Sequence, residues 1–142
     1  LNHIDQIKSN YNKEYRLINL LYELSTIPNS IKKESALYIP KTLKVYWNLS
    51  CDTHMPPFVA PAIANMAMIE GMPLRDQKNS CYTHFYDYGY NTYRIRGIKA
   101  KWIEMDHEKI CQKAKQVGFK RIIEINENKM GEIISIYHEC GG

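Results

Sequence analysis

Two short stretches of this chain have nearly the same sequence. Ser50 to Met55 (SCDTHM) and Ser80 to Phe85 (SCYTHF) share the pattern Ser-Cys-x-Thr-His followed by a large apolar residue. Cysteine and histidine are metal ligands and proton-transfer groups, and threonine offers a hydroxyl that both donates and accepts a hydrogen bond. The repeat is therefore the first place to look for a functional site.

The two histidines of the repeat suit phosphodiester chemistry. Cleavage of RNA needs a base that takes the 2′-hydroxyl proton and an acid that protonates the leaving oxygen, and two imidazoles with an ordinary pKa of about 6.5 can fill both roles without a metal. This hypothesis makes His54 and His84 catalytic, and it has Thr53 and Thr83 bind a phosphate oxygen. It requires the two pentapeptides to lie close together in the folded protein.

Basic and aromatic residues follow the second pentapeptide. Interleaved cations and aromatic rings on a sheet bind single-stranded nucleic acid through phosphate contacts and base stacking. The net charge of +4 and pI of about 8.8 permit an anionic partner without requiring one. The sequence therefore favours RNA or another polyanion as the partner, bound by Tyr88, Tyr90, Arg94, Arg96, Lys99 and Lys101.

Zinc is the alternative reading of the same repeat. Cys51, His54, Cys81 and His84 form two Cys-x-x-His units, which together supply two thiolates and two imidazoles. The predicted setting of the units weakens this alternative, because residues three apart in an extended segment face opposite sides. The ribonuclease hypothesis needs no cofactor, whereas this alternative needs zinc.

A third hypothesis is an interaction domain without chemistry, in which the histidines are satisfied by backbone groups. Whether the chain is an enzyme is left open at this point. Four cysteines are too few for a disulfide-built scaffold of 142 residues, so reduced, partly buried thiols and an intracellular location are favoured, with a Cys51–Cys81 bridge as the alternative.

The length of the chain and the order of its predicted helices and strands indicate a single α+β domain over residues 1–142. We expect a mainly antiparallel sheet of about five strands, an N-terminal amphipathic helix, a buried central helix, and a late helix before a C-terminal hairpin. The expected helices span residues 1–25, 58–70 and 107–117. The expected strands span 36–49, 81–87, 92–103, 119–125 and 132–137.

The end of the chain resembles the carboxyl-terminal part of acetyltransferase-type folds, because a late helix, Gly118-Phe119 and a closing hairpin follow one another. Arg94-Ile95-Arg96-Gly97 is similar to half of the pyrophosphate loop of those folds. Lys99 stands where a small residue is expected, and a strand is predicted where a helix should follow. The resemblance covers about a third of the chain and implies acyl transfer as a weaker alternative function.

Apolar runs in this chain stay shorter than the roughly 18 residues that a membrane-spanning helix needs, so no membrane partner is expected. The oligomeric state is left open.

Overall fold

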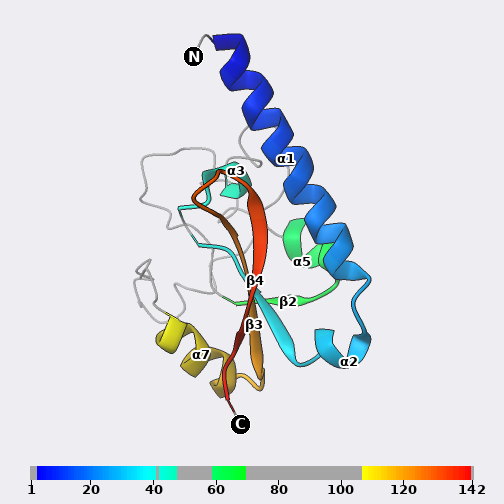
Figure 1. The fold of residues 1–142 in the computed structure, drawn as a ribbon. Coiled ribbons are helices and arrows are strands. Elements are labelled where there is room, and N and C mark those ends of the chain that lie inside the picture. Colours follow the sequence, from blue (N-terminus) through cyan, green and yellow to red (C-terminus); the bar gives the residue numbers. More distant parts are fainter. Residues whose placement is uncertain (1–2, 41, 48–58, 70–106, 142) are drawn as a thin grey trace, which may run out of the picture.

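The computed structural model describes residues 3–40, 42–47, 59–69 and 107–141. In these ranges a long N-terminal helix and a shorter late helix lie on either side of a small sheet (Figure 1). The elements are α1 (His3–Ser25), α2 (Asn29–Lys32), β1 (Ser35–Tyr38), α3 (Lys44–Trp47), α5 (Val59–Ala64), β2 (Ala67–Met68), α7 (His107–Gln116), β3 (Arg121–Glu127) and β4 (Ile133–Glu139).

The described residues form a small α+β domain around a four-stranded mixed sheet with the order β2-β1-β3-β4. Strand β1 is parallel to both β2 and β3, and only β3 and β4 are antiparallel. The prediction of a mainly antiparallel sheet of about five strands is therefore wrong for the part of the chain that the structure describes. Parallel neighbours need a crossover connection, and α3 and α5 lie on the one that joins β1 to β2.

Each face of the sheet carries its own apolar cluster. Leu37 of β1 and Ile123 and Ile125 of β3 belong to the larger cluster, together with the buried leucines of α1. Ile122, the neighbour of Ile123 in the same strand, belongs to a smaller cluster with Ile110 of α7. Successive side chains of a strand point to opposite faces of the sheet, so β3 packs against both clusters. Any single polar side chain of β3 therefore points toward only one of the two clusters.

Helix α1 confirms the predicted amphipathic helix but buries a different stripe from the expected one. The 3.6-residue period of the sequence predicts an inner stripe that includes Tyr15 and Tyr22 and that leucines widen in the second half of the helix. In the structure Tyr15 and Tyr22 are 64% and 58% exposed. The buried side chains are leucines spaced three, four and seven residues apart, which is the spacing of one helical face: Leu17, Leu20, Leu21 and Leu24. The leucines that were expected to widen the stripe are its centre.

The predicted strand over residues 36–49 is only partly correct. It holds for β1 and stops ahead of Pro40, which has no N–H to donate to a sheet. The backbone N–H of Leu43 then bonds the carbonyl of Pro40 at 3.0 Å, and one turn of helix, α3, follows. The proline redirects the chain and does not merely place it at a sheet edge.

The predicted buried helix over residues 58–70 is shorter than expected. Helix α5 ends at Ala64, and Asn65 has a φ of 54°, a left-handed conformation that asparagine adopts more readily than most residues. The chain then forms β2, which the N–H of Ile69 extends through a 2.9 Å bond to the carbonyl of Leu37. An apolar run of this length fits a helix or a buried strand, and here it is divided between the two.

The late helix and the closing hairpin are confirmed. Helix α7 ends at Gln116, Gly118 follows with a φ of 94°, and the N–H of Phe119 bonds the carbonyl of Ala114 at 2.8 Å, as in a Schellman motif. In the hairpin turn the side-chain oxygen of Asn128 accepts bonds from the N–H groups of Met130 and Glu132 at 3.0 and 2.9 Å. These local signals fix the position of β3 relative to α7.

Tyr46 is buried in the larger cluster, where its hydroxyl accepts a 3.3 Å bond from the N–H of Ala60. Burial raises its pKa well above the ordinary value. Because the Tyr46 hydroxyl ionises near pH ~10 in the unfolded chain and at a higher pH in the folded chain, its contribution to stability is present below pH ~10 and is lost as the pH rises above that value.

We expect Tyr46→Phe to lower the free energy of unfolding by about 1 kcal/mol at neutral pH, because the N–H of Ala60 loses its acceptor. We expect this difference from the unmodified protein to shrink in alkaline solution. Urea titrations across this pH range check the prediction, and a deficit that stays constant contradicts it.

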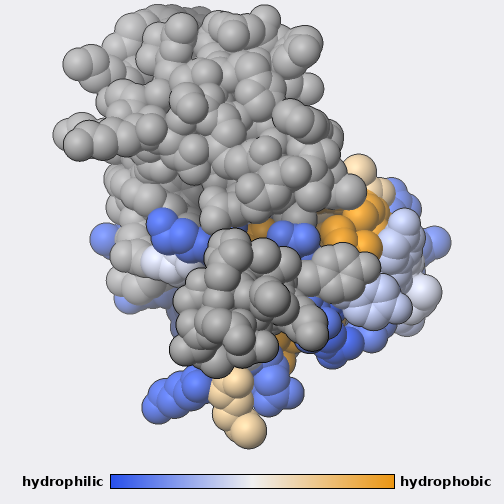
Figure 2. All heavy atoms as spheres, turned by 90° about the horizontal axis from the view of Figure 1, so that it is seen from above, coloured by the Kyte–Doolittle hydropathy of each residue, from blue (hydrophilic) through white to orange (hydrophobic). Residues whose placement is uncertain are grey.

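Seen from above, hydrophilic side chains make up most of the described surface, and hydrophobic ones gather in small areas (Figure 2). The most exposed large apolar side chains lie in α1, in the turns after α7 and β3, and in β4: Tyr15, Tyr22, Val117, Met130 and Tyr137. Among the described helices, none has the length and apolar character needed to cross a bilayer.

Candidate metal centre

The residues that the sequence singled out lie outside the described ranges. This applies to the proposed catalytic pair, to the proposed substrate-binding residues, to the alternative zinc ligands, and to the predicted hairpin over 81–103 that carries several of them. They are Cys51, Thr53, His54, Cys81, Thr83, His84, Tyr88, Tyr90, Arg94, Arg96, Lys99 and Lys101. Their roles and mutual positions stay predictions.

The described residues contain a different group of chemically active side chains. His107, Glu124 and His138 each offer one ligand atom, and the three atoms lie within 4.8 Å of one another. They come from α7, β3 and β4 respectively. The group therefore joins the helix to both strands of the hairpin, and α7 lies beside these strands in Figure 1.

Glu124 lies at the centre of the group because of its place in β3. The strand is rich in β-branched isoleucines, and Glu124 shares the face of Ile122, toward α7, where an apolar side chain would be the default. Its side chain is only 9% exposed. A carboxylate buried to this extent needs hydrogen-bond or ionic partners, because burial without them costs several kcal/mol.

Both histidines meet the same oxygen of Glu124. The Nε2 atom of His138 lies 2.8 Å from Glu124 Oε1, and the Nε2 atom of His107 lies 3.3 Å from that oxygen. The amide of Asn126 donates to the other oxygen, Oε2, at 2.8 Å. The carboxylate is thus held in a fixed orientation, with one oxygen turned toward the two imidazoles.

The two imidazole rings lie against each other. Their centroids are 3.9 Å apart and their planes are inclined by 38°. Acid–base cleavage of a phosphodiester needs the reacting group between the two histidines, which requires a separation of roughly 5 Å or more. His107 and His138 leave no room for that, so they do not reproduce the paired catalysis predicted for His54 and His84.

The spacing of the three ligand atoms suits a metal ion. Zinc bonds of about 2.0 to 2.2 Å in a tetrahedron place ligand atoms about 3.3 Å apart. The observed separations of 2.8 and 3.3 Å from Glu124 Oε1 are close to that value. All three ligand atoms lie within 4.8 Å of one another, so the spacing around Glu124 Oε1 is compatible with a shared ion.

Exposure differs strongly across the group. The side chain of His107 is 66% exposed and that of His138 is 17% exposed. The group is therefore closed on the strand side by β3 and β4 and open to solvent beside the first turn of α7. The N-terminal end of a helix also carries a partial positive charge, which favours the nearby carboxylate.

A disulfide joins the same helix to the same strand end. Cys111 of α7 and Cys140, which follows β4, are bonded with their Cα atoms 5.1 Å apart. The expectation of reduced thiols is therefore wrong for these two cysteines. Closing a loop with a sequence separation of 29 residues contributes about 3 to 4 kcal/mol if the whole effect is loss of chain entropy in the unfolded state.

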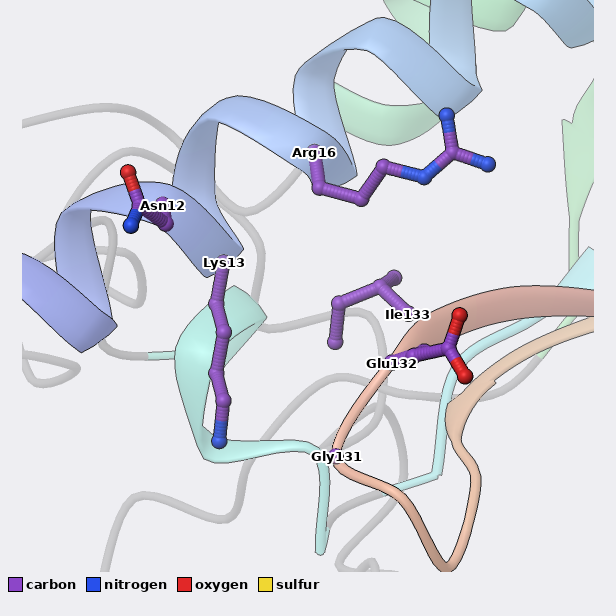
Figure 3. Close-up of a pocket in the computed structure, with 6 residues that line it drawn as sticks. All are labelled: Asn12, Lys13, Arg16, Gly131, Glu132 and Ile133. Atoms are coloured by element: carbon purple, nitrogen blue, oxygen red, sulfur yellow. The ribbon is translucent and has the colours of Figure 1, made fainter.

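A second hollow lies between α1 and the hairpin. Lys13 and Arg16 of the helix face Ile133 and the turn across a space of about 370 Å³ (Figure 3). Both cations already have acidic partners, Lys13 with Glu127 at 2.6 Å and Arg16 with Glu23 at 3.2 Å. This hollow does not offer an anion an uncompensated charge, so it is the weaker candidate.

Sequence reasoning missed the metal group, although three signals pointed to it. Glu124 interrupts a run of isoleucines at a position that faces the helix. His107 and Cys111 are four residues apart in a predicted helix, so they share a face. His138 and Cys140 are two residues apart directly after the strand predicted over residues 132–137. The repeated pentapeptide drew attention away from these spacings.

The chain matches no protein family model, no curated protein and no solved structure. Its function must therefore be inferred from the chemistry of the site.

Proposed function

We propose that this chain is a metal-binding domain that holds a divalent transition-metal ion, with zinc as the reference ion, through His107, Glu124 and His138. The observation that carries the proposal is the convergence of two imidazole Nε2 atoms on one buried carboxylate oxygen. Two imidazoles and one carboxylate are a ligand set that zinc and other first-row divalent ions accept.

The rigidity of the ligands supports the proposal. The amide of Asn126 donates to the second oxygen of Glu124 at 2.8 Å, and the Oδ1 atom of Asn126 accepts a bond from the N–H of Glu127 at 2.8 Å. Residues that orient a metal ligand in this way typically change metal affinity by about 10- to 100-fold. Two of the three ligands lie on neighbouring strands, which fix their separation more firmly than loops would.

The exposed side of the group supports a role for a bound water molecule. Three protein ligands leave a fourth position on a tetrahedral ion, and the exposure of His107 leaves that position accessible to solvent. An ion held by His107, Glu124 and His138 would lower the pKa of a coordinated water molecule and so supply a nucleophile. The proposed reaction class is therefore metal-assisted hydrolysis.

Zinc titration against a chromophoric chelator tests the proposal on the unmodified protein. We expect one zinc ion per chain, and we expect His54→Ala with His84→Ala to leave that affinity unchanged, since neither residue belongs to the group. Loss of binding in this double variant, with folding retained, moves the site to the repeated pentapeptides. Absence of any binding contradicts both zinc proposals.

Binding of RNA or another polyanion is the second candidate function, and the cluster of cations and tyrosines over residues 88–101 supports it. If Arg94, Arg96, Lys99 and Lys101 each contact a phosphate of a single strand, the logarithm of the binding constant falls with the logarithm of salt concentration with a slope of about −2.8. Arg94→Ala with Arg96→Ala is expected to reduce the steepness of that slope by about 1.4. Fluorescence anisotropy with an oligonucleotide measures it, and binding that does not depend on salt contradicts the candidate.

The paired-histidine ribonuclease hypothesis is tested on the same material. Cleavage of RNA that persists with a chelator present and disappears in His54→Ala and His84→Ala supports it. Cleavage that the chelator abolishes assigns the activity to a metal site instead.

A further inference from the structure

We infer that the Cys111–Cys140 disulfide is the oxidised form of a second pair of zinc ligands. In the reduced protein both thiolates bind the ion together with His107 and His138, which makes a tighter, sulfur-containing site. The inference rests on the proposed metal site and adds its regulation by redox state.

The spacing of the four residues within their elements carries the first step. His107 and Cys111 are one helical turn apart on α7, so their side chains lie on the same face. His138 lies in β4, and Cys140 directly follows the strand, where its N–H bonds the carbonyl of Lys120 at 3.0 Å and its side chain belongs to the apolar cluster beside α7. Each element thus contributes one imidazole and one sulfur to the space between them.

The contacts across that space carry the second step. The imidazole rings of His107 and His138 lie 3.9 Å apart, and the Cα atoms of Cys111 and Cys140 lie 5.1 Å apart. Four residues of helix advance about 6 Å, and two residues of strand advance about 6.7 Å. The histidine pair and the cysteine pair are therefore separated by a similar length along the helix and along the strand. The two sulfurs therefore lie about one helical turn along α7 from the two imidazoles, in the space between this helix and the end of the hairpin.

The chemistry of the sulfurs carries the third step. In the disulfide the sulfurs are bonded to each other and lie outside the group of three atoms within 4.8 Å. A dithiol reductant supplies two electrons and two protons, the S–S bond breaks, and the reductant itself becomes a disulfide. Each cysteine is then a thiol that can rotate about its Cα–Cβ bond toward the imidazoles.

Zinc binding completes the change. The ion displaces the two thiol protons, and the two thiolates and two imidazoles fill the four positions that zinc prefers, so Glu124 is released from the ion. By thermodynamic linkage a bound ion makes the thiols harder to oxidise, and oxidation lowers affinity and releases the ion. Cys111 is half-buried and Cys140 is buried, so a small reductant reaches the bond from the Cys111 side.

Cobalt(II) substituted for zinc distinguishes the two forms. We expect the oxidised protein to bind cobalt without a thiolate-to-metal charge-transfer band, and the reduced protein to show this band in the near ultraviolet.

Competition with a chelator is expected to give a zinc affinity more than about tenfold higher after reduction, because thiolates are stronger ligands for zinc than a carboxylate. Binding by the oxidised form with no change on reduction overturns this inference and leaves the proposed metal site intact. Binding that appears only after reduction overturns the proposed site of His107, Glu124 and His138.

Two matched double variants identify the sulfurs. Cys111→Ser with Cys140→Ser is expected to abolish the band and to keep the affinity of the oxidised form. Cys51→Ser with Cys81→Ser is expected to keep the band. The opposite pattern overturns the inference and assigns the thiolates to the repeated pentapeptides.

X-ray absorption at the zinc edge provides a measurement that depends on no variant. For the reduced, one-to-one zinc protein we expect two sulfur neighbours at about 2.3 Å and two nitrogen neighbours at about 2.0 Å. A shell of nitrogen and oxygen alone overturns the inference.

Discussion

Glu124→Gln is expected to weaken zinc binding by the oxidised protein more than about 100-fold, because replacing residues that only orient a ligand already costs about 10- to 100-fold. Glutamine keeps the size and shape of the side chain but removes the negative charge that the ion and both imidazoles share. His138→Ala is expected to lose affinity to a comparable extent, since it removes the imidazole nearest to the carboxylate. Chelator competition measures both losses.

Glu132→Gln is the matched control. Glu132 is an exposed glutamate in the turn of the same hairpin, where its side chain meets only the amide of Asn128 among the bonds described. We expect its zinc affinity to equal that of the unmodified protein. If Glu124→Gln and Glu132→Gln lose the same zinc affinity, the loss reflects the removal of one negative charge from the protein and not the removal of a metal ligand.

Leu21→Ala is expected to lower the free energy of unfolding by about 3 kcal/mol and the Tm by about 10 °C. The side chain of Leu21 is completely buried in the larger apolar cluster between α1 and the sheet. Its truncation removes apolar contact and leaves a cavity that the neighbouring side chains fill only partly. Thermal unfolding followed by circular dichroism measures the change.

Tyr22→Ala, one position along the same helix, supplies the comparison. Tyr22 is mostly exposed, so we expect a change within about 0.5 kcal/mol. The contrast tests whether leucines and not tyrosines form the inner stripe of α1. A larger loss for Tyr22→Ala than for Leu21→Ala would reverse the orientation of the helix.

The parts of the fold that the sequence predicted well depend on local signals. The helical period of α1, the glycine after α7 and the Asn-rich turn between β3 and β4 each act within a few residues, so they can be read without knowing what lies nearby. The hairpin register follows from the turn, because its side-chain bonds fix which residues face each other.

The parts that failed depend on distant partners. Ser35–Tyr38 reads as a strand, but its pairing with Ala67–Met68 on one side and with Arg121–Glu127 on the other is set by contacts far along the chain. The apolar stretch after residue 58 has no period that separates helix from buried strand. Parallel pairing has no turn that announces it, which is why an antiparallel sheet was expected.

The metal group was harder to predict than the fold, because its three residues come from three elements. His107 precedes Glu124 by 17 positions and His138 follows it by 14, and only the packing of α7 on the hairpin brings them together. A repeated motif is conspicuous in a sequence, whereas a site assembled by packing is visible only as single polar residues on apolar faces.

Anomalous scattering from a zinc-soaked crystal of the oxidised protein tests the central claim most directly. We predict one strong peak at the zinc edge, bonded to Nε2 of His107, Oε1 of Glu124 and Nε2 of His138 at about 2.0 to 2.2 Å. A peak at Cys51, His54, Cys81 and His84, or no peak at all, would contradict it.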